Sequence, residues 1–400
     1  MNIFRVVKCN IDSFLVASLL SVNALRVFMG ITKTSVSLYL IYLMTILVLF
    51  TKYQRRIVKM LNSNIKVSYI SFFIIYILLF SFLSLTWVVY EKAPMTFLKF
   101  VISLMIAYLC LFIPAKKISV IMYSFLIINT VYGIYCFLFP MRVVLLFDEG
   151  MNYLNVTLTL GASFTISLVG FALSIFKKEM LKCLIWSLLS TVLFISLTGF
   201  IARGAILIPP IVVFLLTPFM GKKRSLKTIF VVMILSLATI YLSQLYMNMV
   251  SDYGAHRMMK TFEDTENEDR WGIWEYSWQV MVNRKWFIIG GGIDAFRSVA
   301  YYPHNLFLQI LGEFGLIPFI SFVFLQLSIV NRFIKCSRIW DFPYRNMLFF
   351  VVACLIYYTM TFSKSFSFYD GFPVFIMMAL SFSLLEESKS LLKGRNNLMF

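Results

Sequence analysis

Residues 94–140 read PMTFLKFVISLMIAYLCLFIPAKKISVIMYSFLIINTVYGIYCFLFP, and this stretch decides the fold class. Two long apolar runs are separated only by a short break that holds Lys116 and Lys117. A helix needs roughly 20 apolar residues to cross about 30 Å of hydrocarbon, and it satisfies its backbone hydrogen bonds internally. The stretch therefore predicts two transmembrane helices joined by a short basic loop.

The rest of the chain repeats this pattern. Of its 400 residues, 60% are hydrophobic and only 14% are charged, and the mean hydropathy is +0.86. These values exclude a water-soluble core and predict an all-α polytopic membrane protein of about twelve transmembrane helices. The expected spans are residues 13–31, 35–51, 69–90, 94–114, 118–140, 153–176, 181–201, 204–219, 228–249, 305–330, 347–363 and 371–386.

The distribution of charge predicts how these helices are oriented. A net charge of +18 is compatible with nucleic-acid binding, but the Lys and Arg residues fall in short clusters between apolar runs. Cytoplasmic loops of membrane proteins carry an excess of Lys and Arg, and every second loop here is basic. We therefore expect both termini in the cytoplasm of a bacterium, the chain in its inner membrane, and no nucleic-acid partner. The clusters assigned to the cytoplasm lie at residues 52–59, 116–117, 177–182, 222–227, 332–345 and 389–395.

One long polar segment, residues 249–304, interrupts the apolar pattern. It separates nine predicted helices in residues 1–248 from three more, and a cytoplasmic tail, in residues 305–400. The charge pattern places it on the periplasmic side. Its first part is acidic between residues 263 and 269, which is typical of a solvated stretch.

The second part of this loop predicts an amphipathic helix. Trp271, Trp274, Trp278, Met281 and Val282 recur at three- and four-residue spacing, so one face of a helix would be apolar. Such a helix either lies flat at the membrane surface or packs onto the ends of the transmembrane helices. The three glycines at 290–292 are costly in a helix and are expected to end it; a close approach of backbone to phosphate is the weaker alternative.

Three ionisable residues fall inside or at the ends of predicted spans, where charge is expensive and is a functional candidate by default. Arg26 lies in the first span, Glu313 in the tenth, and Arg203 between the seventh and eighth. Pairing between helices or snorkelling would also explain each of them. Arg203 is the most suggestive, because the predicted topology places it on the same side as Arg270 and His304.

His304 is the strongest candidate for proton transfer, since the chain has only one other histidine, His256. An imidazole with an ordinary pKa of about 6.5 can accept a proton from a hydroxyl group near neutral pH. Arginines nearby would bind an anionic substrate and stabilise charge on a departing phosphate. Together these residues fit group transfer from a lipid-linked diphosphate.

Several short motifs combine into a recognisable signature: ARGA at 202–205, RW at 270–271, GGG at 290–292, PHNLFL at 303–308 and EFGLI at 313–317. In this combination the chain resembles the O-antigen polymerase and ligase family across residues 199–320. The resemblance implies a membrane glycosyltransferase with a GT-C-type fold, acting at the periplasmic face on glycans carried by undecaprenyl diphosphate. It implies no metal and no cofactor, and its implied partners include a chain-length regulator and a flippase.

The resemblance also implies roles for individual residues. Arg203 and Arg270 would contact the diphosphate, and His304 would act as general base on the acceptor hydroxyl. Asn305, Glu313, Gly291 and Gly292 are the expected supporting residues, listed here as the remainder of the signature.

Several functions stay open on sequence grounds. General likeness favours a polymerase of lipopolysaccharide repeat units over a ligase that transfers the chain to lipid A–core, and a capsule polymerase shares the same chemistry. A flippase or transporter would also have twelve helices, but it would show paired broken helices in two repeated halves, and no internal repeat is evident. A scaffold within a polysaccharide assembly complex would not explain the placement of the arginines.

Overall fold

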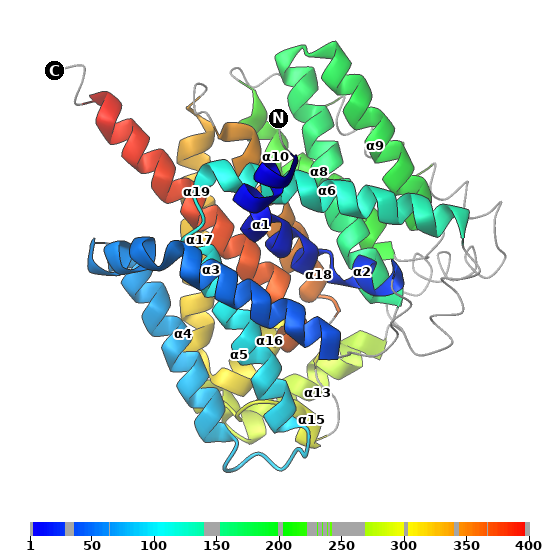
Figure 1. Cartoon of the computed structure of the whole chain (residues 1–400). Coiled ribbons are helices and arrows are strands. Elements are labelled where there is room, and N and C mark those ends of the chain that lie inside the picture. The colour runs from blue at the N-terminus through cyan, green and yellow to red at the C-terminus, as the bar shows by residue number, and fades with distance from the viewer. Residues whose placement is uncertain are drawn as a thin grey trace.

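A computed structural model describes residues 3–28, 36–63, 65–139, 153–198, 203–221, 269–299, 303–339, 344–365 and 367–396, with four single residues between 230 and 241. This part of the chain is helical and contains no strand, as the sequence predicts (Figure 1). Nearly all of the predicted ninth span and the acidic residues 263–268 lie outside it.

The helices follow the apolar runs in chain order. Those before the long loop are α1 (Ile3–Leu20), α2 (Val22–Phe28), α3 (Val36–Ser63), α4 (Ile65–Ser84), α5 (Ala93–Cys110), α6 (Ala115–Leu138), α8 (Tyr153–Lys177), α9 (Met180–Thr198) and α10 (Arg203–Met220). Those in and after it are α13 (Asp269–Asn283), α14 (Trp286–Ile289), α15 (Ala295–Val299), α16 (Leu306–Phe314), α17 (Leu316–Ser337), α18 (Arg345–Phe362), the 3₁₀ turn η1 (Phe368–Asp370) and α19 (Phe372–Asn396).

The described residues contain fewer candidate membrane-crossing helices than the twelve predicted for the whole chain. Within the described ranges, six helices are long and apolar enough to cross a membrane, and a seventh is possible if the bent pair α1–α2 counts as one span. The six are α5, α6, α8, α9, α17 and α18. Two further apolar helices, α4 with 20 residues and α10 with 18 residues, lie on the predicted spans 69–90 and 204–219.

The predicted tenth span, residues 305–330, is not one helix. It is broken at Gly315, whose φ of +87° is closed to most other residues, into the short α16 and the membrane-length α17. Glu313 therefore lies in the last turn of α16, just before the break, and not in the middle of a straight span. The first span is similarly bent by 79° between α1 and α2, which carries Arg26 in its last turn.

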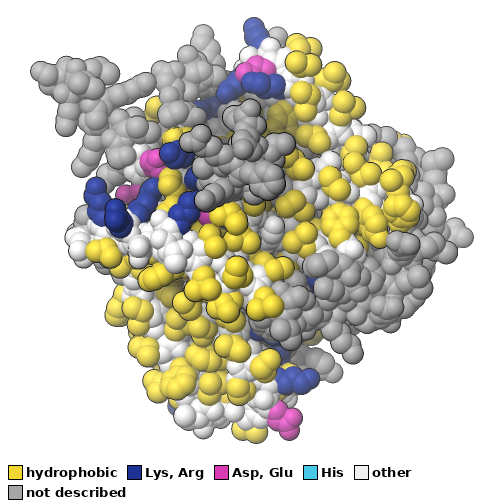
Figure 2. All heavy atoms as spheres, viewed as in Figure 1, with side chains coloured by type: hydrophobic (Ala, Val, Ile, Leu, Met, Phe, Trp, Pro, Cys, Tyr) yellow, Lys and Arg dark blue, Asp and Glu magenta, His cyan; other side chains and the backbone are white. Residues whose placement is uncertain are grey.

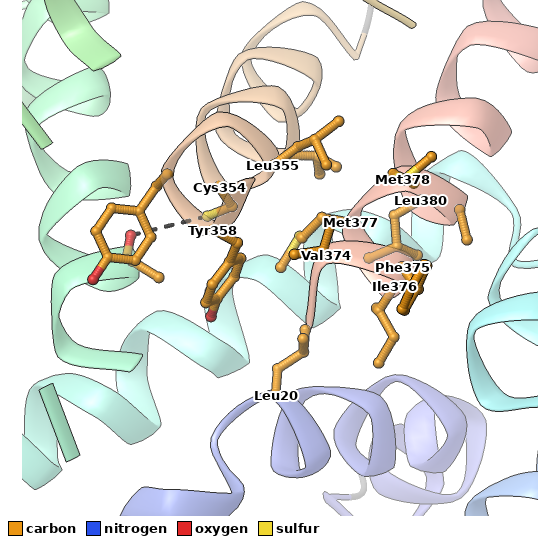
Figure 3. Packing of buried hydrophobic residues seen from close by; sticks show 14 of the residues in the cluster. Leu20, Cys354, Leu355, Tyr358, Val374, Phe375, Ile376, Met377, Met378 and Leu380 are labelled. Carbon is orange, nitrogen blue, oxygen red and sulfur yellow. Dashed lines mark hydrogen bonds between the residues drawn. The ribbon is translucent and has the colours of Figure 1, made fainter. Parts of the chain in front are cut away.

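The core is centred on α8 and α18. Buried residues make up 83% of the apolar part of α8 and 78% of that of α18, whereas only 17% of α9 is buried, so α9 faces outward. Figure 3 shows side chains of α18 and α19 packed against each other, with Leu20 of α1 closing the cluster from below. The thiol of Cys354 points to the carbonyl oxygen of Ala162 in α8, at 3.9 Å.

Charged side chains concentrate at one end of the bundle, above a surface that is otherwise largely apolar (Figure 2). This is the end that carries the basic clusters, and the sequence predicts it to be cytoplasmic. Ion pairs join its helices: Arg332–Glu386 at 2.6 Å, Lys52–Asp12 at 2.6 Å and Arg56–Glu387 at 3.5 Å.

Arg345, at the start of α18, binds the carboxyl ends of α10 and α17 in the same region. It is 3% exposed and donates hydrogen bonds to the carbonyl oxygens of Phe219 (3.0 Å), Met220 (2.7 Å) and Ser337 (3.3 Å). The carboxyl ends of α10 and α17 therefore meet at this end. Their amino ends, and α16 with them, lie toward the opposite end.

Candidate active site around helix α16

His304 lies immediately before α16. Its backbone is left-handed, with φ of +48°, and its side chain is half-buried. The next residue, Asn305, is the N-cap of α16: its Oδ1 accepts hydrogen bonds from the backbone N–H groups of Phe307 (3.0 Å) and Leu308 (3.1 Å). Asn305 thus holds the start of the helix and fixes the chain direction at His304.

The glycines of residues 290–292 pack against the other end of α16. Gly291 N–H donates to the carbonyl oxygen of Gly312 (2.8 Å), and Gly292 N–H donates to that of Glu313 (2.9 Å). A Cβ atom on Gly290 would lie 2.6 Å from the Glu313 carbonyl oxygen, and one on Gly315 would lie 2.7 Å from that of Ile288. We call this contact of residues 288–292 with residues 312–315 the glycine junction.

The sequence predicts that these glycines end the amphipathic helix, or allow the backbone to approach a phosphate, and the structure gives them a different role. The glycines do not end the amphipathic helix, because α13 stops at Asn283, Lys285 turns the chain with φ of +57°, and α14 follows. The N–H groups of Gly291 and Gly292 are already bonded to backbone carbonyls. The glycines are therefore needed for close contact between two backbones.

The last residue of α4 and the segment that follows this helix also contact the junction. The indole N–H of Trp87 donates to the carbonyl oxygen of Gly291 (3.0 Å), and Ser84 Oγ accepts from the backbone N–H of Ile293 (2.9 Å). Trp87 and Gly291 are 204 residues apart in the sequence, and Ser84 and Ile293 are 209 apart. Two distant segments of the chain therefore meet at this junction.

A buried hydrogen-bond network extends from the glycine junction to η1. Tyr369 donates its hydroxyl proton to Glu313 Oε2 and accepts a hydrogen bond from the backbone N–H of Asp294 (2.9 Å). Gln309 donates to the same Glu313 oxygen (3.2 Å) and accepts from the backbone N–H of Phe368 (2.7 Å). Because Glu313 and Gln309 are both 0% exposed, this network ties α16 rigidly to η1.

The predicted role of Glu313 in support of the site is compatible with this position, and it stays a prediction. The alternative considered for Glu313 was pairing with a neighbouring element. The structure shows such pairing as hydrogen bonds from two neutral groups, the Tyr369 hydroxyl and the Gln309 amide.

Asp294 and Arg297 add a charged pair beside the junction. Asp294 is fully buried, and its Oδ1 lies 3.5 Å from Nε of Arg297, whose guanidinium faces the ring of Tyr90 at 5.9 Å. Burial raises the pKa of the Asp294 carboxyl above its ordinary value, although the positive charge of Arg297 opposes this shift.

Helix α13 does not form the single apolar face that the sequence predicts, because its apolar residues divide between two directions. Met281 is fully buried and Trp274 is partly buried, whereas Trp271 is 61% exposed, Trp278 51% and Val282 43%. Its inner side contacts α14 and α16. The packing interpretation therefore holds for one side of the helix, and contact of the exposed indoles with the membrane surface stays a prediction.

The two candidate arginines lie at the start of their helices. Arg203 begins α10, and because α10 ends beside Arg345, Arg203 lies toward the α16 end of the bundle. Arg270 is in the first turn of α13, the helix that packs on α16. The side chains of Arg203 and Arg270 fall outside the described residues, so their convergence with His304 stays a prediction.

Sequence reasoning missed Asp294, Arg297, Gln309 and Tyr369. Asp294 and Arg297 follow the glycines with the i, i+3 spacing of an acid–base pair, and this spacing was a usable signal. Nothing local marks Tyr369, which comes from the chain beyond α18. In the described ranges no three His, Cys, Asp or Glu side chains group in a way that could hold a metal ion.

Comparison with known proteins agrees with the signature. Residues 183–323 match the family model described as O-antigen ligase, and this range includes Arg203, Arg270, the glycine junction and His304. No curated protein matches the chain at a significant level. The chain is thus a multi-pass membrane protein that carries, in residues 183–323, a domain of the O-antigen ligase family.

Proposed function

We propose that this protein is an O-antigen polymerase, which joins oligosaccharide repeat units carried on undecaprenyl diphosphate at the periplasmic face of the inner membrane. The observation that carries the proposal is the family match over residues 183–323, with His304 held at the start of α16 and the helices of Arg203 and Arg270 directed to the same region.

In the proposed reaction, His304 removes the proton from a hydroxyl group of the acceptor repeat unit. The acceptor oxygen forms a bond to the anomeric carbon of the donor glycan, and the bond from that carbon to the diphosphate oxygen breaks. Undecaprenyl diphosphate leaves with the bonding electrons. Arg203 and Arg270 bind this diphosphate and stabilise its developing charge, as arginine pairs with phosphate through two parallel hydrogen bonds.

The rigid surroundings of α16 support this mechanism. A general base must lie within hydrogen-bond distance of the proton it removes, and small displacements cost large factors in rate. The Asn305 cap fixes one end of α16, and the glycine junction and the Tyr369–Glu313 contact fix the other. This arrangement would hold His304 in one position while substrates bind and leave.

A ligase that transfers the finished glycan to lipid A–core would use the same donor and the same residues. A flippase is a candidate from a different class, and the break at Gly315 resembles the interrupted helices of transporters. Complementation of glycan-deficient cells separates the three. A ladder of glycan lengths on a gel supports a polymerase, restored attachment of glycan to lipid A–core supports a ligase, and a glycan carrier that accumulates on the inner face without the gene supports a flippase.

Point variants then test the residues. We expect His304→Ala and Arg270→Ala to reach the membrane at normal levels and to abolish the ladder. Arg338→Ala, an exposed arginine at the opposite end of the bundle, is the matched control and should leave the ladder intact. Normal extension by both site variants would refute the proposed roles.

A further inference from the structure

A cavity lies away from α16, at the charged end of the bundle. It has a volume of about 240 Å³, is open on one side and is lined by residues of α6, α8, α9 and α18. Its polar lining consists mainly of Lys177, Lys182, Glu179 and Asn346, and its apolar lining includes Trp186 and Phe350. None of these residues takes part in the proposed glycosyl transfer.

The cavity is built to attract an anion. Lys177 donates to Asn346 Oδ1 at 3.1 Å, and Lys182 lies 3.1 Å from Glu179 Oε1. Two lysines and one glutamate leave a net positive charge. Lys182 and Asn346, which line the cavity, lie in the first turns of α9 and α18, and helix amino ends carry partial positive charge.

One wall of the cavity is held by close packing. The Trp186 ring lies so near α8 that a Cβ atom on Gly170 would come within 2.4 Å of it, and it packs edge-on against Phe350 at 5.4 Å. The indole therefore has little freedom to close the cavity. A preformed cavity loses less free energy to ordering when a ligand binds.

The location points to a lipid. The adjoining face of α9 presents large apolar side chains outward: Leu181 is 72% exposed and Leu188 60%, and Ile185, which lines the cavity, is 48% exposed. These side chains face the membrane in a chain of this type. At about 240 Å³ the cavity is smaller than the roughly 300–1,000 Å³ of pockets that enclose drug-sized molecules. It can hold a headgroup whose acyl chains remain in the bilayer.

We propose that this cavity binds the phosphate headgroup of an anionic phospholipid from the leaflet predicted to be cytoplasmic. Lys177 and Lys182 pair with the phosphate, Asn346 donates a hydrogen bond through its amide nitrogen, and the face of α9 receives the acyl chains. Basic pockets between transmembrane helices on the cytoplasmic side are suited to such headgroups. A bound lipid would join the α8–α9 hairpin to the start of α18.

The test titrates the purified full-length protein with phosphatidylglycerol and with phosphatidylcholine and counts bound lipid by native mass spectrometry. We expect phosphatidylglycerol to bind in preference. Each lysine near an anionic lipid contributes about fivefold in affinity, so Lys177→Gln with Lys182→Gln should weaken binding about 25-fold. Lys178→Gln is the matched control, because Lys178 is an exposed neighbour that does not line the cavity, and it should bind normally.

Three results would overturn the assignment: equal binding of the two lipids, unchanged binding by the double variant, or an equal loss in Lys178→Gln. Competition by millimolar inorganic phosphate would show that the site takes a free anion and would also overturn the assignment to a lipid. If the double variant is unstable, Ser174→Met fills the cavity without a change of charge, and it must weaken phosphatidylglycerol binding as well.

Discussion

Gly290→Ala is the most direct test of the glycine junction. Gly290 has φ of +97° and ψ of 148°, a conformation that is essentially restricted to glycine. An added Cβ would lie 2.6 Å from the Glu313 carbonyl oxygen and 2.9 Å from Cα of Phe314, and both are backbone atoms that cannot rotate away. The substitution therefore combines backbone strain with overpacking.

The expected size of the effect follows from these two costs. A non-glycine residue in such a conformation costs about 1–3 kcal/mol. Overpacking a close contact costs about 1–3 kcal/mol more, so we expect a loss of about 2–6 kcal/mol in the free energy of unfolding. Thermal unfolding of the purified protein in detergent measures the loss, and the glycan ladder in complemented cells measures activity.

The chain offers a matched control. Gly272 lies in helix α13, and a Cβ there would meet no atom within 4 Å. Gly272→Ala should stabilise its helix by up to about 1 kcal/mol. The reasoning is refuted if Gly290→Ala unfolds at the same temperature as the unmodified protein. Loss of activity at unchanged stability would instead favour a phosphate contact at the glycines.

Three further predictions concern single contacts. Tyr369→Phe removes the hydroxyl that donates to Glu313, so the unfolding free energy should fall by about 1–3 kcal/mol, and an unchanged unfolding temperature would contradict the buried network. Arg345→Lys keeps the charge but loses the forked geometry that reaches three carbonyl groups, and it should lower the unfolding temperature, whereas the exposed Arg338→Lys should not. If the outer side of α13 lies in the headgroup layer, brominated lipids should quench Trp271 fluorescence, so Trp271→Ala should reduce the quenched fraction; no change would place that indole in water.

The helical class and most helix positions followed from the sequence, because hydropathy and length act within one segment. The runs at 94–114, 118–140 and 153–176 became α5, α6 and α8 with only small shifts of their ends. Within the described residues only six or seven helices have the length and hydropathy expected of a span, because the first apolar run is bent, the tenth is divided at Gly315, and most of the ninth lies outside those residues. The break at Gly315 was missed, since a single glycine in an apolar run gives a weak signal of a break.

The candidate site, too, could be predicted from the sequence only in part. His304 and the motif around it were identified from a local pattern, and the family match covers that pattern. Tyr369 and the turn at Asp294 are 75 residues apart, and Trp87 and Gly291 are 204 apart, so no local window relates them.

The amino-acid sequence by itself determined that the chain is a membrane protein and which of its loops are basic. It also determined which histidine and which arginines are candidates for chemistry. Each of these depends on the composition or order of residues within one segment. Only the tertiary structure decided that the glycines serve backbone contact and that Glu313 bonds to Tyr369. These outcomes depend on which segments pack together, and packing is set by the shape of the whole bundle.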